Sequence, residues 1–386
     1  MVDWKDLKKD KGIKDLSKIG LANVIGSIFS AIFWFYLAPI LGTENYGQVG
    51  YFISVASIAG VISLFGAGRI LLVYRPKGIE IQGAIFTIAI IGSIISSVVL
   101  YFLFNQIGIS VFVIGYVLFG LVIGDTLGQK FYQKYFKYFV SQKILFLIIS
   151  IGMYYALGVE GIVLGFGLSY ILYGFKVYKI LQNSKISFNL LKKKLGFISN
   201  SYVTDLTNVF SSHSDRLILG ALFGFALLGN YQLSIQVLAV LTMLPSIVFQ
   251  YILPRESSGL SNNKLKNITI VISIFIVILV VTLSPVAIPW VFPQFEESIL
   301  LLQIGIFALI PKTIVLMHTS KFLSIENSRV VLISTGIFLI LQISGIFILG
   351  EFFGIYGAAI ALVLGGIGQT VYLTIAKQRL KEQNNI

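Results

Sequence analysis

Residues 19–68 read IGLANVIGSIFSAIFWFYLAPILGTENYGQVGYFISVASIAGVISLFGAG, a stretch in which the only charged side chain is that of Glu44. A helix that crosses the hydrocarbon core of a bilayer needs about 20 mostly apolar residues. The stretch is long enough for two such helices, Ile19–Leu41 and Tyr46–Gly68, separated by Gly42 and the polar residues after it. It therefore predicts a helical hairpin embedded in a membrane.

The same pattern continues along the chain of 386 residues. Hydrophobic residues make up 56% of it and charged residues 12%, and its mean hydropathy is +0.91. Soluble domains carry about 25% charged residues, so a water-soluble globular protein is excluded. We predict an all-α integral membrane protein with about 12 transmembrane helices. Ten further apolar runs supply the remaining spans: Ile81–Phe104, Gly108–Gly128, Ile144–Leu157 (extended backward), Gly161–Leu181, Leu195–Leu219, Gly229–Leu253, Ile268–Val291, Ser298–Leu316, Val330–Leu349 and Ile355–Ile375.

The positive charges alternate between successive connections. Of the 29 Lys and Arg residues, 27 lie at the two ends of the chain or in every second loop, and the other loops carry only Glu. Because Lys and Arg concentrate on the cytoplasmic side, this predicts a multi-pass protein with both termini in the cytoplasm. The net charge of +13 is thus assigned to topology and to contact with anionic membrane lipids, not to nucleic acid.

The two halves of the chain resemble each other at an offset of 182 residues, which aligns Gly42 with Gly224 and Gly47 with Gly229. Both halves begin on the same side of the membrane, so the repeat is parallel and predicts two six-helix lobes, a transporter architecture. The resulting divisions are a cytoplasmic leader (1–18), an N-lobe (19–181), a basic cytoplasmic linker (182–194), a C-lobe (195–376) and a cytoplasmic tail (377–386).

The seventh predicted span is unusually polar. Ser201, Asp205, Asn208, Ser212 and Asp215 follow i, i+4, i+7, i+11 and i+14, which places them on one helical face. Such a stripe cannot face acyl chains, so it predicts a water-filled cavity or a polar interface.

The repeat extends this argument to the first span. Asn23 aligns with Asp205, and Ser30 aligns with Ser212. We therefore expect the first and seventh spans to line one central cleft.

Charged side chains within membrane spans are candidates for function, because each costs about 2.5–3.5 kcal/mol at mid-membrane. Asp215 and Arg216 either pair with each other or leave Arg216 to meet an anionic substrate. Asp205 is either a hydrogen-bonded or protonated carboxyl or a proton or cation site, and Lys312 either extends to the cytoplasmic interface or faces the cleft.

Two groups near the predicted cytoplasmic ends of spans, Arg69 and Asp125, are expected to be solvated, although Arg69 is also a candidate for contact with substrate. Trp34, Trp290 and Tyr46 are interpreted mainly as packing residues and interface anchors.

Motifs of catalysis are missing from the sequence. It contains no phosphate-binding P-loop, no H-E-x-x-H and no G-x-S-x-G. Cysteine is absent and there are only two histidines, so we expect no enzyme activity, no cofactor and no metal site.

Two motifs resemble a known family. Leu37-Ala38-Pro39-Ile40-Leu41-Gly42-Thr43-Glu44-Asn45-Tyr46-Gly47 resembles the A-R-x-L-G-x-x-x-[YF]-G opening of the polysaccharide-biosynthesis flippases. These are the Wzx-type O-antigen translocases of the multidrug/oligosaccharidyl-lipid/polysaccharide (MOP) exporter superfamily, whose fold is MATE-like. Asp215-Arg216-Leu217-Ile218-Leu219-Gly220, followed by Gly229-Asn230-Tyr231, is similar to that family's D-R-x-x-L-G … G-x-Y. Pro39 replaces the family's common arginine, and twelve spans differ from the fourteen typical of peptidoglycan-precursor flippases.

The resemblance implies an alternating-access transporter of a prokaryotic plasma membrane that flips a polyprenyl-(di)phosphate-linked oligosaccharide from the cytoplasmic to the outer leaflet. It also implies H+ or Na+ as a possible coupling ion and glycan polymerase or ligase partners. Arg216, Arg69 and Lys312 would be the candidates for contact with phosphate. Two alternatives stay open: a cation-coupled multidrug exporter of the same fold, with Asp205 as the coupling carboxylate, and a membrane scaffold that does not transport.

Overall fold

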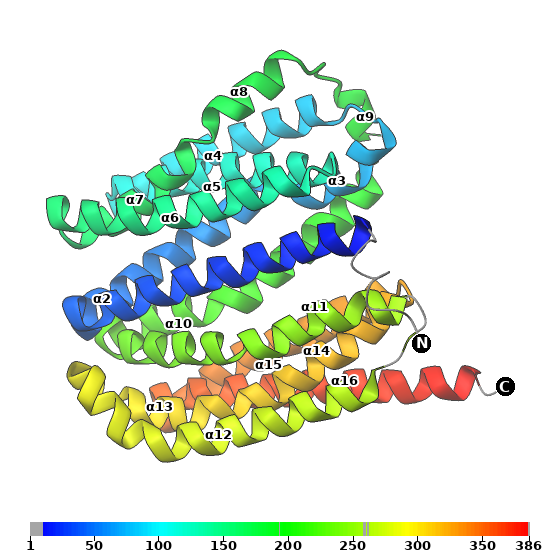
Figure 1. Ribbon diagram of the computed structural model, residues 1–386. Coiled ribbons are helices and arrows are strands. Elements are labelled where there is room, and N and C mark those ends of the chain that lie inside the picture. Colours follow the sequence, from blue (N-terminus) through cyan, green and yellow to red (C-terminus); the bar gives the residue numbers. More distant parts are fainter. Residues whose placement is uncertain (1–10, 193, 258–259, 261, 385–386) are drawn as a thin grey trace. The chain divides into compact units, whose positions relative to one another are not determined.

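The computed structural model describes residues 11–192, 194–257, 260 and 262–384, and these residues form helices and short connections without a β-strand. Figure 1 shows the order of the helices along the chain. The predicted leader lies outside the described residues up to position 10, and from Lys11 onward it is helical. The helices are α2 (Lys11–Leu64), α3 (Ala67–Tyr74), α4 (Gln82–Phe104), α5 (Ile107–Gly128), α6 (Tyr132–Leu157), α7 (Val159–Ile171), α8 (Gly174–Gln182), α9 (Phe188–Lys192), α10 (Leu195–Leu241), α11 (Met243–Ser257), α12 (Asn263–Val291), α13 (Ser298–Gly305), α14 (Leu309–Ser324), α15 (Ser328–Phe353) and α16 (Ile355–Asn384).

The predicted all-α membrane architecture is confirmed. The described part of the chain contains 10 helical stretches that are long and apolar enough to cross a membrane. Two of them, Lys18–Leu64 with 47 residues and Leu195–Ser257 with 63 residues, are each long enough for two crossings. Each of these stretches corresponds to two of the predicted spans, which accounts for the expected number of about twelve. The side of the membrane on which the termini lie stays a prediction.

The two long stretches are broken at equivalent positions. Gly42 in α2 has φ 69° and ψ 177°, and Gly224 in α10 has φ 80° and ψ 175°. A side chain at such a positive φ would be strained, so glycine is needed for the break. These are the two residues that the offset of 182 aligns, so the repeat seen in the sequence recurs in the backbone.

The helical segments that follow the two breaks pack closely. A Cβ atom built on Gly47 would lie 2.0 Å from the carbonyl oxygen of Phe225, and one built on Gly229 would lie 1.9 Å from that of Thr43. The contact is reciprocal, because Thr43 and Phe225 are also related by the offset of 182. The second glycine of each motif is therefore a packing residue that lets two backbones approach.

Three boundaries differ from the predicted spans. The short fifth span is the end of α6, which begins as early as Tyr132. The sixth span is interrupted after Ile171, where α7 ends before α8 begins. The tenth span consists of α13, one 3₁₀ turn and α14, which ends at Ser324.

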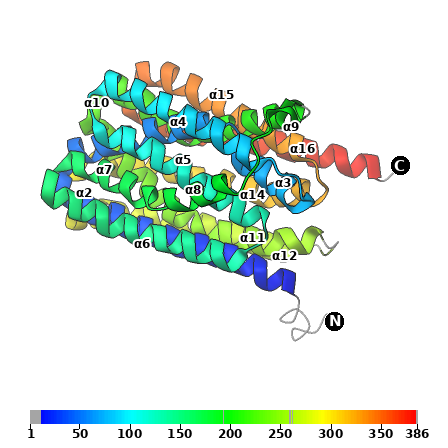
Figure 2. The same cartoon turned by 90° about the horizontal axis from the view of Figure 1, so that it is seen from above.

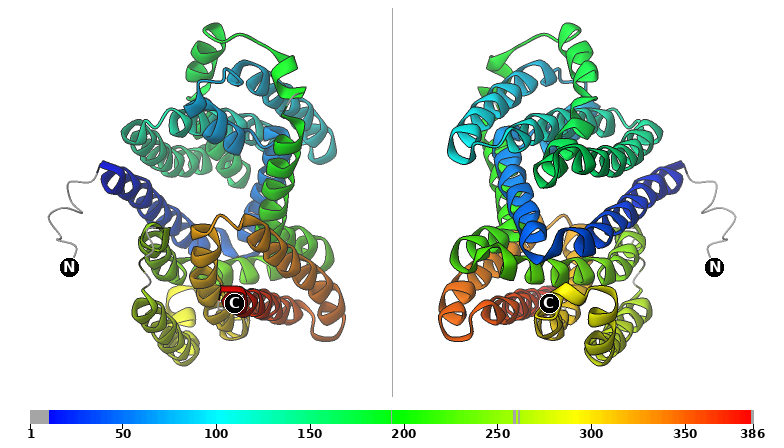
Figure 3. Two further views of the ribbon diagram at one scale, coloured as in Figure 1. Left: turned by 90° about the vertical axis from the view of Figure 1, so that its right-hand side faces the viewer. Right: turned by 90° about the vertical axis from the view of Figure 1, so that its left-hand side faces the viewer.

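Contacts divide the chain into two compact units. Unit 1 comprises the part up to Ser30 together with Phe52–Val209, and unit 2 comprises Ala31–Tyr51 and Phe210–Ile386. In unit 1, α5 packs against α4 and α7, and α7 packs against α6 (Figure 2). In unit 2, α15 and α16 form a long hairpin, and α14 packs against α11 and α16 (Figure 3). The lobe limits drawn from the sequence stay a prediction.

Aromatic side chains in unit 2 divide between the two roles expected of them, close packing and contact with the membrane. Tyr46 is fully buried and Trp34 is 8% exposed, so both are packing residues and not interface anchors. Their ring centroids are 5.3 Å apart, and Tyr46 also packs edge-on against Phe295. Trp290, which is 86% exposed, is available to contact the membrane.

Candidate functional site

Asp215 and Arg216 are adjacent on α10, but their side chains have different partners. Asp215 is 4% exposed; its Oδ2 accepts a hydrogen bond from the Tyr231 hydroxyl at 2.8 Å, and its Oδ1 accepts one from the Arg216 backbone N–H at 2.8 Å. None of the ion pairs formed by the described residues joins Asp215 to Arg216. The buried carboxylate is thus satisfied by neutral donors.

The Arg216 guanidinium is held by neutral acceptors. Its Nε donates to Gln232 Oε1 at 2.6 Å, and its Nη1 donates to the Ser212 carbonyl at 2.8 Å and lies 3.2 Å from His213 Nδ1. Gln232 is itself buried, at 2% exposure. No hydrogen bond links Nη2 to any residue that the structure describes. A guanidinium carries five N–H donors, so this arrangement fixes the cation and leaves donors for a further acceptor.

Two more residues of unit 2 interact with this cation. Lys312, on α14, has an exposed side chain and interacts electrostatically with both Arg216 and Asp215. Tyr46 also interacts electrostatically with Arg216, and within the described chain its buried hydroxyl has no hydrogen-bond partner. The cluster therefore combines two cations with one carboxylate, and we call Asp215, Arg216, Tyr231, Gln232 and Lys312 the Arg216 cluster.

In unit 1, the structure brings together two predicted site residues that lie 136 positions apart. Arg69 Nε donates to Asp205 Oδ1 at 2.6 Å, with the side chains 45% and 26% exposed. Arg69 was expected to be solvated or to meet substrate, and its short ion pair with Asp205 was not foreseen. The pair neutralises both charges within unit 1.

The other predicted site residues are uncharged, and the structure places them along α2 and α10. Asn23 Oδ1 accepts a weak hydrogen bond from the Tyr135 hydroxyl at 3.4 Å, and Ser30 is half-buried on α2. Along the polar face of α10, Ser201 is buried, whereas Asn208 and Ser212 are exposed. The stripe is thus exposed at Asn208 and Ser212 and buried at Ser201 and Asp215, and its role in lining a cavity stays a prediction.

The expectation for Asp125 is wrong. It is 2% exposed and accepts a hydrogen bond from Arg75 Nε at 2.6 Å, in an ion pair that joins α5 to the turn after α3. The charge is buried because its partner comes from a neighbouring element, which spacing along the chain does not reveal.

Tyr231 and Gln232 are the residues that sequence reasoning missed. Tyr231 ends the Gly229-Asn230-Tyr231 motif and Gln232 follows it directly. The break at Gly224 folds this segment back to Asp215 and Arg216. The usable signal was the motif's position directly after the second glycine break. No group of three or more His, Asp or Glu residues that could hold a metal ion occurs in the described chain.

The chain is similar to known proteins in its fold and not in its sequence. No protein-family model matches the chain, and no curated protein matches its sequence. Among solved structures, it is similar to lipid II flippase MurJ in an inward closed conformation, with a TM-score of 0.78 and 15% identity over 93% of this chain and 87% of that one. An inward-facing multidrug resistance MATE transporter of the MOP superfamily gives a TM-score of 0.68 at 15% identity, covering 93% and 96%.

A MATE transporter of Vibrio cholerae is also similar, with a TM-score of 0.60 and 14% identity over 96% of this chain and 97% of that one. At these identities the comparisons establish the architecture and not the substrate. Over more than nine-tenths of its length, the chain therefore has the fold shared by lipid II flippase MurJ and the MATE transporters.

Proposed function

We propose that this protein translocates a polyprenyl-(di)phosphate-linked oligosaccharide across a prokaryotic plasma membrane by alternating access. The transporter fold supports the general class. The observation that carries the specific proposal is Arg216, whose guanidinium is positioned by Gln232 and the Ser212 carbonyl and has no carboxylate partner in the described chain.

The chemistry of the cluster suits a phosphate. A diphosphate that leaves water needs fixed, charge-assisted donors, and a guanidinium offers two parallel ones. Lys312 adds a second positive charge in the same unit, while Asp215 is already bonded to Tyr231. Arg69 is a poorer candidate than the sequence suggested, because Asp205 neutralises it.

The sugar headgroup needs a hydrophilic path, which the accessible part of the α10 stripe supplies. Asn208 and Ser212 are exposed in a segment that has to cross the membrane, and hydroxyl and amide groups can replace water around a glycan. The cytoplasmic termini, a coupling ion and partner polymerases or ligases belong to the same proposal as expectations.

The competing function, a cation-coupled exporter, assigns the coupling role to Asp205. A carboxylate bound to a guanidinium at 2.6 Å would have to release that partner before it bound a proton or a sodium ion. This requirement favours the flippase over the exporter.

A reconstitution assay tests the proposal. Proteoliposomes would contain undecaprenyl-diphosphate-linked N-acetylglucosamine, with a soluble galactosyltransferase and its sugar donor added outside. We expect the enzyme to modify more of the lipid in these vesicles than in protein-free ones, because flipping renews the outer pool. The proposal is wrong if the fraction of modified lipid equals that of protein-free vesicles. If, in addition, an ion gradient drives the export of ethidium, the protein is a cation-coupled exporter.

A further inference from the structure

Unit 2 contains a pocket that is separate from the Arg216 cluster. It lies where α11, α12, α14 and α16 meet, has a volume of about 510 Å³ and is not lined by Arg216 or Lys312. Pockets that bind small molecules typically measure about 300–1,000 Å³. The pocket is therefore large enough for a lipid headgroup.

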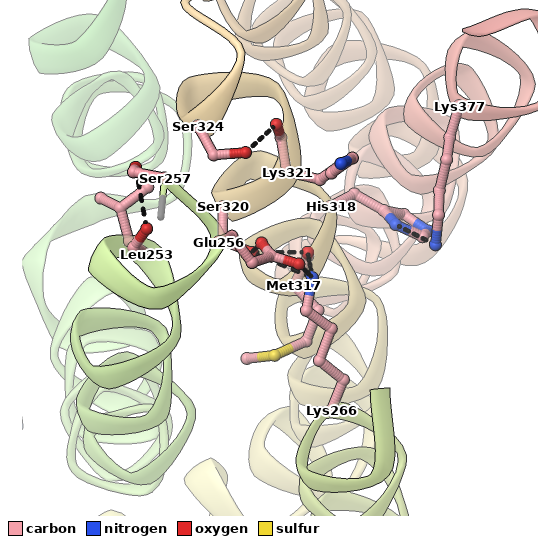
Figure 4. Close-up of polar contacts among 10 residues, drawn as sticks. All are labelled: Leu253, Glu256, Ser257, Lys266, Met317, His318, Ser320, Lys321, Ser324 and Lys377. Carbon is pink, nitrogen blue, oxygen red and sulfur yellow. Dashed lines mark hydrogen bonds and ion pairs between the residues drawn. The ribbon is translucent and has the colours of Figure 1, made fainter. Parts of the chain in front are cut away.

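One wall of the pocket is a closed polar network (Figure 4). Lys266 Nζ donates to Glu256 Oε1 at 2.6 Å, to the Met317 carbonyl at 2.9 Å and to Ser320 Oγ at 3.1 Å. Ser320 Oγ in turn lies 2.6 Å from Glu256 Oε2. The Lys266 and Glu256 side chains are 8% and 5% exposed, and their charges cancel. This network ties α11, α12 and α14 together and gives the pocket a rigid wall.

A second group of side chains brings net positive charge. Lys377 Nζ lies 3.4 Å from His318 Nδ1 (Figure 4). His318 Nε2 lies 3.3 Å from Thr374 Oγ1. An ammonium can only donate, so His318 accepts through Nδ1 and is neutral in this arrangement. Lys321 is exposed one turn after His318 on α14. The lining residues therefore include three lysines, Lys266, Lys321 and Lys377, and one carboxylate, Glu256.

The remaining lining residues are the polar Asn263 and Asn267 and the apolar Ile270, Ile314, Ile325 and Leu380. In this part of unit 2, α12 begins at Asn263 and α14 ends at Ser324, close to the pocket residues. Because a helix of membrane-crossing length ends near the surface of the bilayer, we place the pocket at the depth of lipid headgroups. Basic pockets between helix ends at this depth attract anionic lipids.

We propose that this pocket binds the phosphate of an anionic phospholipid, with Lys321 and Lys377 contacting the phosphate and the isoleucines contacting the glycerol and the first acyl carbons. The site is independent of the transported substrate. Free phosphate offers the same anionic chemistry without the apolar part, so it should bind more weakly than the lipid.

Native mass spectrometry of the full chain in detergent tests the site, with phosphatidylglycerol, phosphatidylcholine and inorganic phosphate as probes. We expect the wild-type protein to hold one phosphatidylglycerol more tightly than phosphatidylcholine. Lys321→Gln should weaken this binding about fivefold, and Lys321→Gln/Lys377→Gln about 25-fold, with binding of phosphatidylcholine unchanged. Lys264→Gln is the matched control, because Lys264 is exposed on the first turn of α12 and does not line the pocket.

Each outcome decides the proposal. If inorganic phosphate binds with the same dependence on the lysines but phosphatidylglycerol does not, the site takes free phosphate and the lipid source is wrong. If the double variant binds phosphatidylglycerol like the wild type, or Lys264→Gln weakens binding as much, no phosphate site exists there. If the double variant does not fold, the single variant Lys321→Gln still tests the site. Lys321 is exposed, and its side chain makes no hydrogen bond or ion pair with the described residues, so this variant should fold.

Discussion

Replacement of Arg216 by alanine separates a substrate role from a structural one. The substitution removes the guanidinium but keeps the backbone N–H that donates to Asp215, and the Tyr231 hydroxyl remains in place. Asp215 is therefore not left without partners. Gln232 Oε1, which is buried, loses its donor, at a cost of about 1–3 kcal/mol for an unsatisfied polar group.

The binding free energy that Arg216→Ala removes from the phosphate of the substrate should be at least as large as this cost in stability. A hydrogen bond to a charged group contributes about 1.5–3 kcal/mol, so loss of even one guanidinium–phosphate bond should slow flipping by about 10- to 150-fold. Arg216→Lys should retain part of the activity, because it keeps the charge but not the two parallel donors. Flipping is measured in proteoliposomes and normalised to the amount of folded protein.

A double substitution separates the two effects. Arg216→Ala/Gln232→Leu removes both partners of the buried hydrogen bond, which is close to neutral for stability. We expect it to restore abundance in the membrane but not flipping. Arg255→Ala is the control, because that arginine lies over the Tyr251 ring in the same unit and should leave flipping unchanged. If the double variant flips substrate at the wild-type rate, Arg216 is only structural and the reasoning is refuted.

Three other predictions address the fold and the second charged pair. Gly47→Ala should destabilise the protein by roughly 1–3 kcal/mol or more, because the new Cβ would overlap a backbone carbonyl, whereas Gly152→Ala, with no atom within 4 Å, should not lower the melting temperature. A double-mutant cycle on Arg69 and Asp205, read from unfolding free energies, should give a coupling of only about 0.2–1 kcal/mol, because the pair is part-exposed; a value several times larger would contradict this. A cysteine at Glu351 should react with an impermeant thiol reagent on intact cells, and labelling only after permeabilisation would reverse the predicted topology.

The two glycine breaks show how far sequence reasoning could reach. The offset of 182 residues identified Gly42 and Gly224 as equivalent, and hydropathy located the spans around them. The polar residues after Gly42 looked like a loop, but the helix resumes at once, and Asn45 Nδ2 donates to the Leu41 carbonyl across the break. A single glycine with positive φ is enough for the change of direction, and composition alone does not distinguish it from a longer turn.

The candidate site was less predictable, because its partners come from elsewhere in the chain. Periodicity placed Asp205 and Asp215 on one face of a helix, but it could not show that Arg69 pairs with the first or that Tyr231 binds the second. The interpretation of Asp215 and Arg216 as an ion pair rested on their adjacency. Neighbours on a helix point about 100° apart, so each side chain meets different partners.

The most direct test of the central claim varies the ligand and not the protein. Binding of undecaprenyl diphosphate, undecaprenyl phosphate and undecaprenol to the purified wild-type protein would be compared in the same detergent. If fixed cations of the Arg216 cluster recognise the phosphate, the affinity should fall stepwise from the diphosphate to the alcohol, with about 1.5–3 kcal/mol lost per charge-assisted contact. Equal affinity for all three lipids would mean that the protein binds only the polyprenyl chain. This result would contradict the claim that the Arg216 cluster recognises the phosphate of the substrate.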